Sequence, residues 1–324
     1  MIRSLLYGVF ITVVILFISF IYVLKKALSR EIFDVFFSLD KRFFFFSLLS
    51  MLFYHTFDNL RLFILSRAMN LRYSFLYGYV VSFINTFGAT ITPAHVGGEM
   101  MSLYLLSRKG ARLHKVISIV TMKTLTGMAF FTFLTPLLAY HFYKSQETAI
   151  KLLAILLVLS ALTFGFYRVG RIFFDRSKKE KSLSLMIRVK YTFKRFLVVT
   201  KLFLRDKKRH LFFATVSSML LYISFLSSGA FLIKAFEQSV SFQKAVFVQI
   251  TLIYAIFLSP TPGGSGVGEI GGLEVFSGIL PLSVLGTFVI LWRLITQYLS
   301  AMIGGVFFFI LLFRDSKDYL FKVI

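Results

Sequence analysis

The hydrophobic and polar positions of this 324-residue chain form long apolar runs joined by short charged connections. Runs long enough to span a bilayer occur near 4–24, 43–66, 75–92, 116–140, 149–167, 211–235, 243–258 and 282–312. Because about 20 apolar residues are needed to cross about 30 Å of hydrocarbon, the pattern predicts about eight transmembrane helices. The run at 282–312 is long enough to bend at Gly304 and Gly305. The ten-residue alternation of a β-barrel is missing, so the predicted fold class is an all-α integral membrane protein.

Two stretches interrupt this pattern with proline and glycine. They are ITPAHVGGE at 91–99 and SPTPGGSGVGE at 259–269. Proline and glycine end helices, and irregular backbone at membrane depth survives only where protein or a wet cavity satisfies it. We therefore predict two re-entrant hairpins. Their backbone turns are expected to use Pro93, Gly97, Gly98, Pro262, Gly263, Gly264 and Gly266.

The two stretches also match each other. Both run from Thr-Pro through glycines to Gly-Glu. Each glutamate is followed 24 residues later by a cation within an apolar run, Lys123 after Glu99 and Arg293 after Glu269. Matching broken segments in two halves of a chain are typical of transporter binding sites, so we predict a pseudo-repeat.

Composition and charge agree with a membrane protein. Hydrophobic residues make up 57% of the chain and charged residues 16%, which leaves too little polar surface to cover a soluble fold. The net charge is +23, and 168–210 alone holds 15 basic residues against three acidic ones. Basic residues concentrated between apolar runs indicate a cytoplasmic loop rather than a nucleic-acid site. We predict one polytopic domain over 1–324, with halves at 1–167 and 211–324.

The basic loops also predict an orientation. Placing 25–42, 108–115 and 168–210 on the cytoplasmic side puts the N-terminus outside and makes the two repeats parallel. An inverted arrangement of the two repeats, which requires one membrane crossing fewer between the halves, remains an alternative. Residues 186–197 fit either an amphipathic surface helix or a solvated connector.

Charged residues within apolar runs are the candidate lipid-binding residues. They are Asp58, Arg61, Glu99, Lys123, Glu269 and Arg293. An ionised side chain at the bilayer centre costs on the order of 3 kcal/mol, so such residues face an interior cavity and pair with one another. The glycine loops offer free N–H groups to a phosphate, which the three cations would also attract. The alternative is that these charges only neutralise one another and fix helix register.

Metal and cofactor chemistry have no signal in the sequence. The chain has no cysteine, and its five histidines lack metal-binding spacing. No metal and no cofactor are therefore expected.

These motifs resemble the flippase-like family, the transmembrane region of lysylphosphatidylglycerol synthases and their stand-alone relatives. The likeness rests on Arg61, the two broken stretches, Lys109-Gly110, Lys123 and Arg293, and it covers nearly the whole chain. It implies translocation of a polar or anionic lipid between leaflets of the cytoplasmic membrane, through a cavity lined by re-entrant helices. The implied partners are membrane lipids, an anionic or aminoacylated phospholipid above all, and no nucleic acid. Homo-oligomerisation stays open.

Bifunctional relatives add a soluble aminoacyl-transfer domain. Since this chain ends at Ile324, just after its last apolar run, lipid aminoacylation is not expected. We predict a transporter rather than an enzyme, and the missing Walker A motif argues against direct ATP coupling. Two alternatives remain. One is a membrane-embedded transferase on a lipid-linked substrate, since two carboxylates near a basic cluster allow acid–base chemistry. The other is a non-catalytic scaffold of a lipid-synthesis complex.

Overall fold

The computed structural model describes residues 37–111, 113–144, 201–323 and the single positions 150, 154, 157 and 198. These residues form helices and loops and no strand, which confirms the all-α fold class. The predicted helix at 4–24 lies outside the described residues. So do most of the predicted helix at 149–167, most of the basic loop at 168–210 and almost all of its 186–197 segment.

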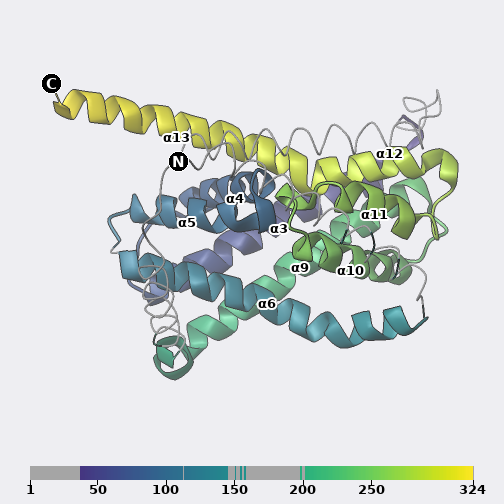
Figure 1. Cartoon of the computed structure of the whole chain (residues 1–324), viewed down its shortest axis with the longest axis horizontal. Coiled ribbons are helices and arrows are strands. Elements are labelled where there is room, and N and C mark those ends of the chain that lie inside the picture. Colours follow the sequence, from purple (N-terminus) through teal and green to yellow (C-terminus); the bar gives the residue numbers. More distant parts are fainter. Residues whose placement is uncertain are drawn as a thin grey trace, which may run out of the picture.

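The apolar runs form helices close to their predicted bounds (Figure 1). These are α3 (Lys41–Ala68), α4 (Phe75–Thr90), α6 (Leu113–Lys144), α9 (Lys208–Phe236) and α10 (Phe242–Leu258). Each broken stretch forms a 3₁₀ turn followed by a short helix: η1 (Pro93–His95) with α5 (Val96–Ser107), and η2 (Pro262–Gly264) with α11 (Val267–Phe276). The last run forms α12 (Leu282–Arg293), the π-helical turn η3 (Leu294–Tyr298) and α13 (Leu299–Val323).

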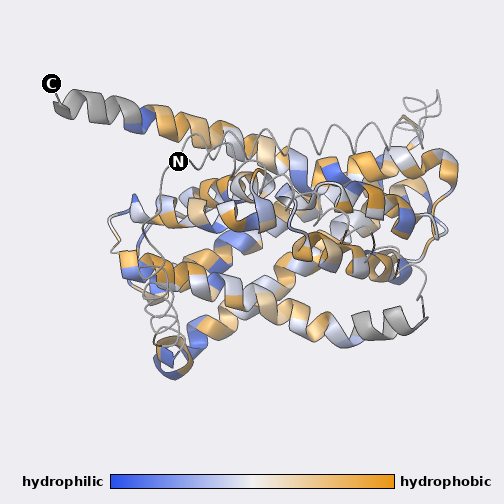
Figure 2. Cartoon of the chain, viewed as in Figure 1, coloured by the Kyte–Doolittle hydropathy of each residue, from blue (hydrophilic) through white to orange (hydrophobic). Residues whose placement is uncertain are grey.

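Three stretches of the described chain are long and apolar enough to cross a membrane: Leu113–Pro136, Lys208–Phe236 and Leu282–Asp315. Hydrophobic residues run along all the helices in Figure 2. The helix α3 is also long, with 28 residues and a length of about 42 Å at about 1.5 Å per residue. It carries the buried charged residues Asp58 and Arg61.

The last apolar run is irregular at a different place from the one predicted. Its regular hydrogen bonding changes at η3, directly after Arg293, and not at Gly304 and Gly305. Gly304 instead marks the point where α13 crosses α4, since a Cβ there would lie 2.0 Å from the Phe83 carbonyl oxygen. Small residues let two helix backbones approach in this way.

The first broken stretch forms a helical hairpin of α4, η1 and α5. Its two helices run antiparallel, because the Tyr77 hydroxyl donates to the Leu105 carbonyl at 2.9 Å and Ser102 donates to Asn85 at 3.0 Å. Both ends of the hairpin therefore lie together, and η1 forms its tip.

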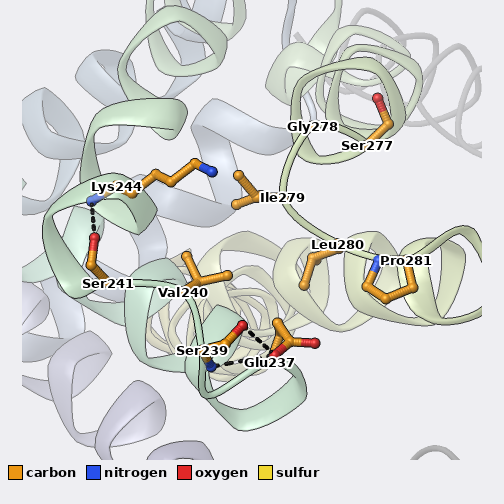
Figure 3. A pocket seen from close by; sticks show the side chains of 10 residues that line it. All are labelled: Glu237, Ser239, Val240, Ser241, Lys244, Ser277, Gly278, Ile279, Leu280 and Pro281. Atoms are coloured by element: carbon orange, nitrogen blue, oxygen red, sulfur yellow. Dashed lines mark hydrogen bonds between the residues drawn. The ribbon is translucent and has the colours of Figure 1, made fainter.

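The second broken stretch forms the corresponding hairpin of α10, η2 and α11. Ser241 and Lys244 at its start lie around the same hollow as Ser277 and Pro281 at its end (Figure 3). Ser241 caps α10 by accepting from the Lys244 N–H at 3.3 Å. This hollow therefore marks the open end of the second hairpin, and η2 is its tip.

The two halves are inverted relative to each other, not parallel as the charge pattern predicted. The helices that lead into the hairpins, α3 and α9, pack antiparallel: the Asp40 N–H donates to the Ala235 carbonyl at 3.1 Å, while Arg61 Nη1 donates to Ser218 at 3.5 Å. Buried serines allow their close approach, as where Ser228 donates to the Ser47 carbonyl at 2.9 Å. The open ends of the two hairpins therefore lie at opposite ends of the molecule, and their tips η1 and η2 contact each other. Figure 1 shows α4 and α5 on the left and α10 and α11 on the right.

The orientation error has a specific cause. The prediction counted two helices between the first two basic loops, the runs at 43–66 and 75–92, whereas the structure adds α5, which runs back along α4. Lys41 consequently lies at one end of α3, and Lys109 lies at the other, where its ammonium is 4.1 Å from the centre of the Tyr77 ring. Within the described residues, Lys41 and Lys109 therefore lie at opposite ends of α3.

Candidate functional site

The six charged residues predicted as a lipid site form three ion pairs in the described structure. They are Asp58 with Arg61, Glu99 with Lys123, and Glu269 with Arg293. The last two are the pairs whose members are 24 residues apart in both halves of the chain. The pseudo-repeat therefore corresponds to a repeated pairing of a carboxylate after a broken turn with a cation on the following helix.

Asp58 and Arg61 form a closed pair. Arg61 donates to Asp58 Oδ1 from Nε at 2.9 Å and from Nη2 at 2.6 Å, and Ser82 donates to Oδ2 at 2.6 Å. Because Ser82 uses its proton on Asp58, it accepts from His55 Nδ1 at 2.9 Å, which leaves His55 Nε2 to accept from Ser300 at 2.8 Å. This line of hydrogen bonds ties α3 to α4 and α13.

Glu269 and Arg293 form a second closed pair. Arg293 donates from Nε to Glu269 Oε1 at 2.8 Å and from Nη2 to the Gly263 carbonyl at 3.0 Å. The Tyr298 hydroxyl also donates to Glu269, and the Gly266 N–H donates to its Oε2 at 2.5 Å. The pair thereby holds η2, α11 and α12 together.

Glu99 and Lys123 form an open pair. The Lys123 ammonium lies 3.7 Å from Glu99 Oε1, which is beyond hydrogen-bond distance. No hydrogen bond from this ammonium is found within the described part of the chain, although the Lys123 side chain is only 2% exposed. The Glu99 side chain is 37% exposed, and its Oε2 is buried without a partner among the described residues.

The open pair lines a cavity of about 500 Å³. A second cavity of about 160 Å³ adjoins it and shares Arg61, His95, Glu99, Lys123, Tyr222 and Phe257 with it. The smaller cavity continues to Arg293 and Gln297 in the second half of the chain. The tertiary structure therefore brings one cation from each of the three pairs to the lining of these two adjoining cavities.

The floor and the mouth of the larger cavity differ in polarity. The floor contains the buried cations Arg61 and Lys123. At the mouth lie the apolar side chains of Val96, Met128 and Leu258, which are 55%, 58% and 71% exposed. Such a cavity can hold the polar end of an amphipathic molecule while its apolar part leaves through the mouth.

Several residues of this site were not predicted from the sequence. Gln297 donates to the Gly263 carbonyl at 2.9 Å and to Thr90 at 3.2 Å. It therefore joins η2, the tip of the second hairpin, to the C-terminal end of α4 in the first hairpin. Its place four residues after Arg293, on the same helical face, is a signal that could have identified it. Tyr222 comes from the middle of α9, and no local pattern distinguishes it from the other residues of that apolar run.

The two tips share one backbone conformation. In each, a proline precedes two residues with left-handed φ, Ala94 (51°) and His95 (58°) in η1 and Gly263 (59°) and Gly264 (65°) in η2. The predicted turn glycines Gly97 and Gly98 lie instead in the first turn of α5. There they allow close packing, since a Cβ on Gly97 would lie 2.4 Å from the carbonyl oxygen of Gly88.

Replacing Gly263 with alanine should lower the free energy of unfolding by about 1–3 kcal/mol. The left-handed φ disfavours a side chain, and the new Cβ would lie 2.3 Å from Gln297 Nε2 and 3.1 Å from Thr90 Cα. Thermal unfolding in detergent measures this loss. Gly278→Ala is the matched control, because its Cβ would meet nothing within 4 Å. Equal stability of the two variants would show that the tip does not have this conformation.

Comparison with known proteins finds a matching family and a similar protein. Residues 5–304 match the family described as "Lysylphosphatidylglycerol synthase TM region", a range that contains all six charged residues and both hairpins. A similar protein is the "UPF0104 membrane protein" of Archaeoglobus fulgidus. It is 24% identical over 263 residues, which cover 76% of this chain and 80% of that protein.

Proposed function

Because this chain belongs to the family of the lysylphosphatidylglycerol synthase transmembrane region, we propose that it moves a polar or anionic lipid between the leaflets of the cytoplasmic membrane. One observation carries the proposal: the cavity has a charged floor and an apolar, exposed mouth. A phospholipid has the same division, with a charged headgroup and apolar chains. A phospholipid with a polar or charged headgroup is the proposed cargo.

The phosphate of the lipid is assigned to Lys123. Arg61 and Arg293 already donate to carboxylates at 2.6–2.9 Å, whereas the Lys123 ammonium has, among the described residues, no acidic partner nearer than Glu99 at 3.7 Å. An ammonium with three donors and no close acceptor gains most from an incoming phosphate. Arg61 lines the same cavity and adds to its positive potential.

We also propose that the chain crosses the membrane several times and that both hairpins are re-entrant. The helices α4 and α5 contain 16 and 12 residues, so they extend about 24 and 18 Å and are shorter than the hydrocarbon core of about 30 Å. The hairpins would then enter from opposite faces and meet at mid-membrane. The end that carries Lys109 and 207–209 would be cytoplasmic, as the positive-inside rule requires.

Replacing Lys123 with glutamine should slow lipid translocation by about tenfold or more, because a phosphate would lose its one available buried cation. The measurement uses proteoliposomes and phospholipids labelled on an acyl chain, with dithionite quenching of the outer leaflet. Lys244→Gln is the control, since Lys244 is an exposed lysine at the open end of the second hairpin (Figure 3). If wild type does not accelerate any lipid, the proposal fails and a scaffold role becomes the better hypothesis. If Lys123→Gln equals wild type, the phosphate is not held by Lys123.

A further inference from the structure

The two equivalent ion pairs of the inverted repeat differ in how completely they are bonded. Both oxygens of Glu269 accept hydrogen bonds, from Arg293, Tyr298 and the Gly266 N–H. In the equivalent pair, Glu99 Oε2 has no partner and the Lys123 ammonium donates no hydrogen bond, among the residues that the structure describes. One pair thus holds the fold together, while the other leaves a cation and an anion unsatisfied in one cavity.

The unsatisfied groups have opposite charges and lie close together. Glu99 Oε1 is 3.7 Å from the Lys123 ammonium, so a ligand held by one group is also within reach of the other. A headgroup with only a phosphate would satisfy Lys123 but bring a negative charge against the Glu99 carboxylate. Like-charge contacts of this kind discriminate against a ligand, so the cavity disfavours a purely anionic headgroup.

The wall beside the open pair is aromatic. The rings of Phe131, Tyr222, Tyr254 and Phe257 line the cavity, and the Phe131 ring lies 4.7 Å from that of Phe257 and 5.1 Å from that of Tyr254, centre to centre. Aromatic faces attract ammonium groups. Within the described residues, no arginine or lysine is stacked on these four rings, in contrast to Arg293 on the Tyr298 ring. The Tyr222 ring is stacked on Phe130 at 4.5 Å and the Phe257 ring on His95 at 5.7 Å, so each of these two rings has at most its other face open to a ligand cation.

We propose that the cavity selects a zwitterionic phospholipid headgroup, with its phosphate at Lys123 and its ammonium between Glu99 and the aromatic wall. The inference rests on the proposed function and specifies its substrate class. A headgroup with both charges satisfies both open groups. Because the three ion pairs have no net charge together, a zwitterionic headgroup also leaves the net charge of the site at zero.

The test compares two lipids that differ in the headgroup cation. Phosphatidylethanolamine and phosphatidylglycerol, each labelled on an acyl chain, are followed in proteoliposomes with wild type, Glu99→Gln and Glu237→Gln. Glu237 is the control, because its carboxylate accepts from Ser239 at the open end of the second hairpin, outside the cavity (Figure 3). Wild type and Glu237→Gln should move phosphatidylethanolamine about tenfold faster than phosphatidylglycerol, and Glu99→Gln should bring that ratio close to one.

The outcomes separate the inference from the function on which it rests. If wild type moves phosphatidylglycerol as fast as phosphatidylethanolamine, the zwitterion inference is overturned and lipid translocation stands. If Glu99→Gln slows both lipids equally, Glu99 does not hold the ammonium, and the inference is overturned in the same way. Uptake of soluble glycerophosphoethanolamine without movement of phosphatidylethanolamine would show that the cargo is the free headgroup compound. Movement of no lipid at all would overturn the proposed function as well.

Discussion

Replacing Arg293 with methionine should lower the free energy of unfolding in detergent by about 3–5 kcal/mol, the largest loss expected from a single substitution in this chain. Arg293 is 2% exposed and donates to the buried carboxylate of Glu269. Methionine fills a similar volume but removes the only cation that neutralises this carboxylate among the described residues, which would leave a lone buried charge. It also removes the donor to the Gly263 carbonyl in η2. Chemical denaturation monitored by circular dichroism measures the change.

Two further variants distinguish the loss of the buried ion pair from a general loss of stability on removing an arginine. Arg72→Met removes an exposed arginine and should change stability by no more than about 0.5 kcal/mol. Glu269→Leu combined with Arg293→Met should recover much of the loss, because no uncompensated charge remains. If Arg293→Met alone is as stable as wild type, Glu269 must already be uncharged and the closed pair is not an ion pair.

Replacing Gly304 with alanine should lower the free energy of unfolding by about 2–3 kcal/mol, because overpacking at a rigid contact forces the backbone to move. The new Cβ would lie 2.0 Å from the carbonyl oxygen and 2.5 Å from the carbonyl carbon of Phe83. Both atoms belong to the α4 backbone, so α13 and α4 would have to separate. Thermal unfolding in detergent measures the loss of stability.

The adjacent glycine gives a matched control for this substitution. A Cβ on Gly305 would meet only ring carbons of Phe87, at 3.2 and 3.3 Å, and a side chain can shift by a few tenths of an ångström. Gly305→Ala should therefore cost less than about 1 kcal/mol. If the two variants are equally destabilised, α13 does not cross α4 at Gly304.

Local features of the chain were predictable from the sequence. The length of an apolar run limits what a helix can cross, so α3, α6, α9 and α10 begin and end within a few residues of their predicted bounds. Proline and glycine act on the backbone within a few residues, so both broken turns were located correctly. The shared spacing of 24 residues also predicted a repeat, and in the structure each carboxylate with this spacing pairs with its cation.

The relation between the halves was not predictable from such local signals. It depends on the antiparallel packing of α3 on α9, made by contacts between residues as far apart as Ser47 and Ser228, 181 positions along the chain. The helix count that left out α5 gave a parallel repeat, and the packing of α3 on α9 shows that it is inverted.

The sequence by itself therefore determined the helical membrane class, the two broken turns and the repeated spacing of carboxylate and cation. Only the tertiary structure decided that the hairpins meet tip to tip, that one pair is closed and the other open, and that aromatic side chains from α6, α9 and α10 form the wall beside the open pair. The physical reason is the distance along the chain over which each interaction acts. Hydrophobic length and helix breaking act between near neighbours in the chain, whereas the bonding of a buried charge depends on every helix packed around it.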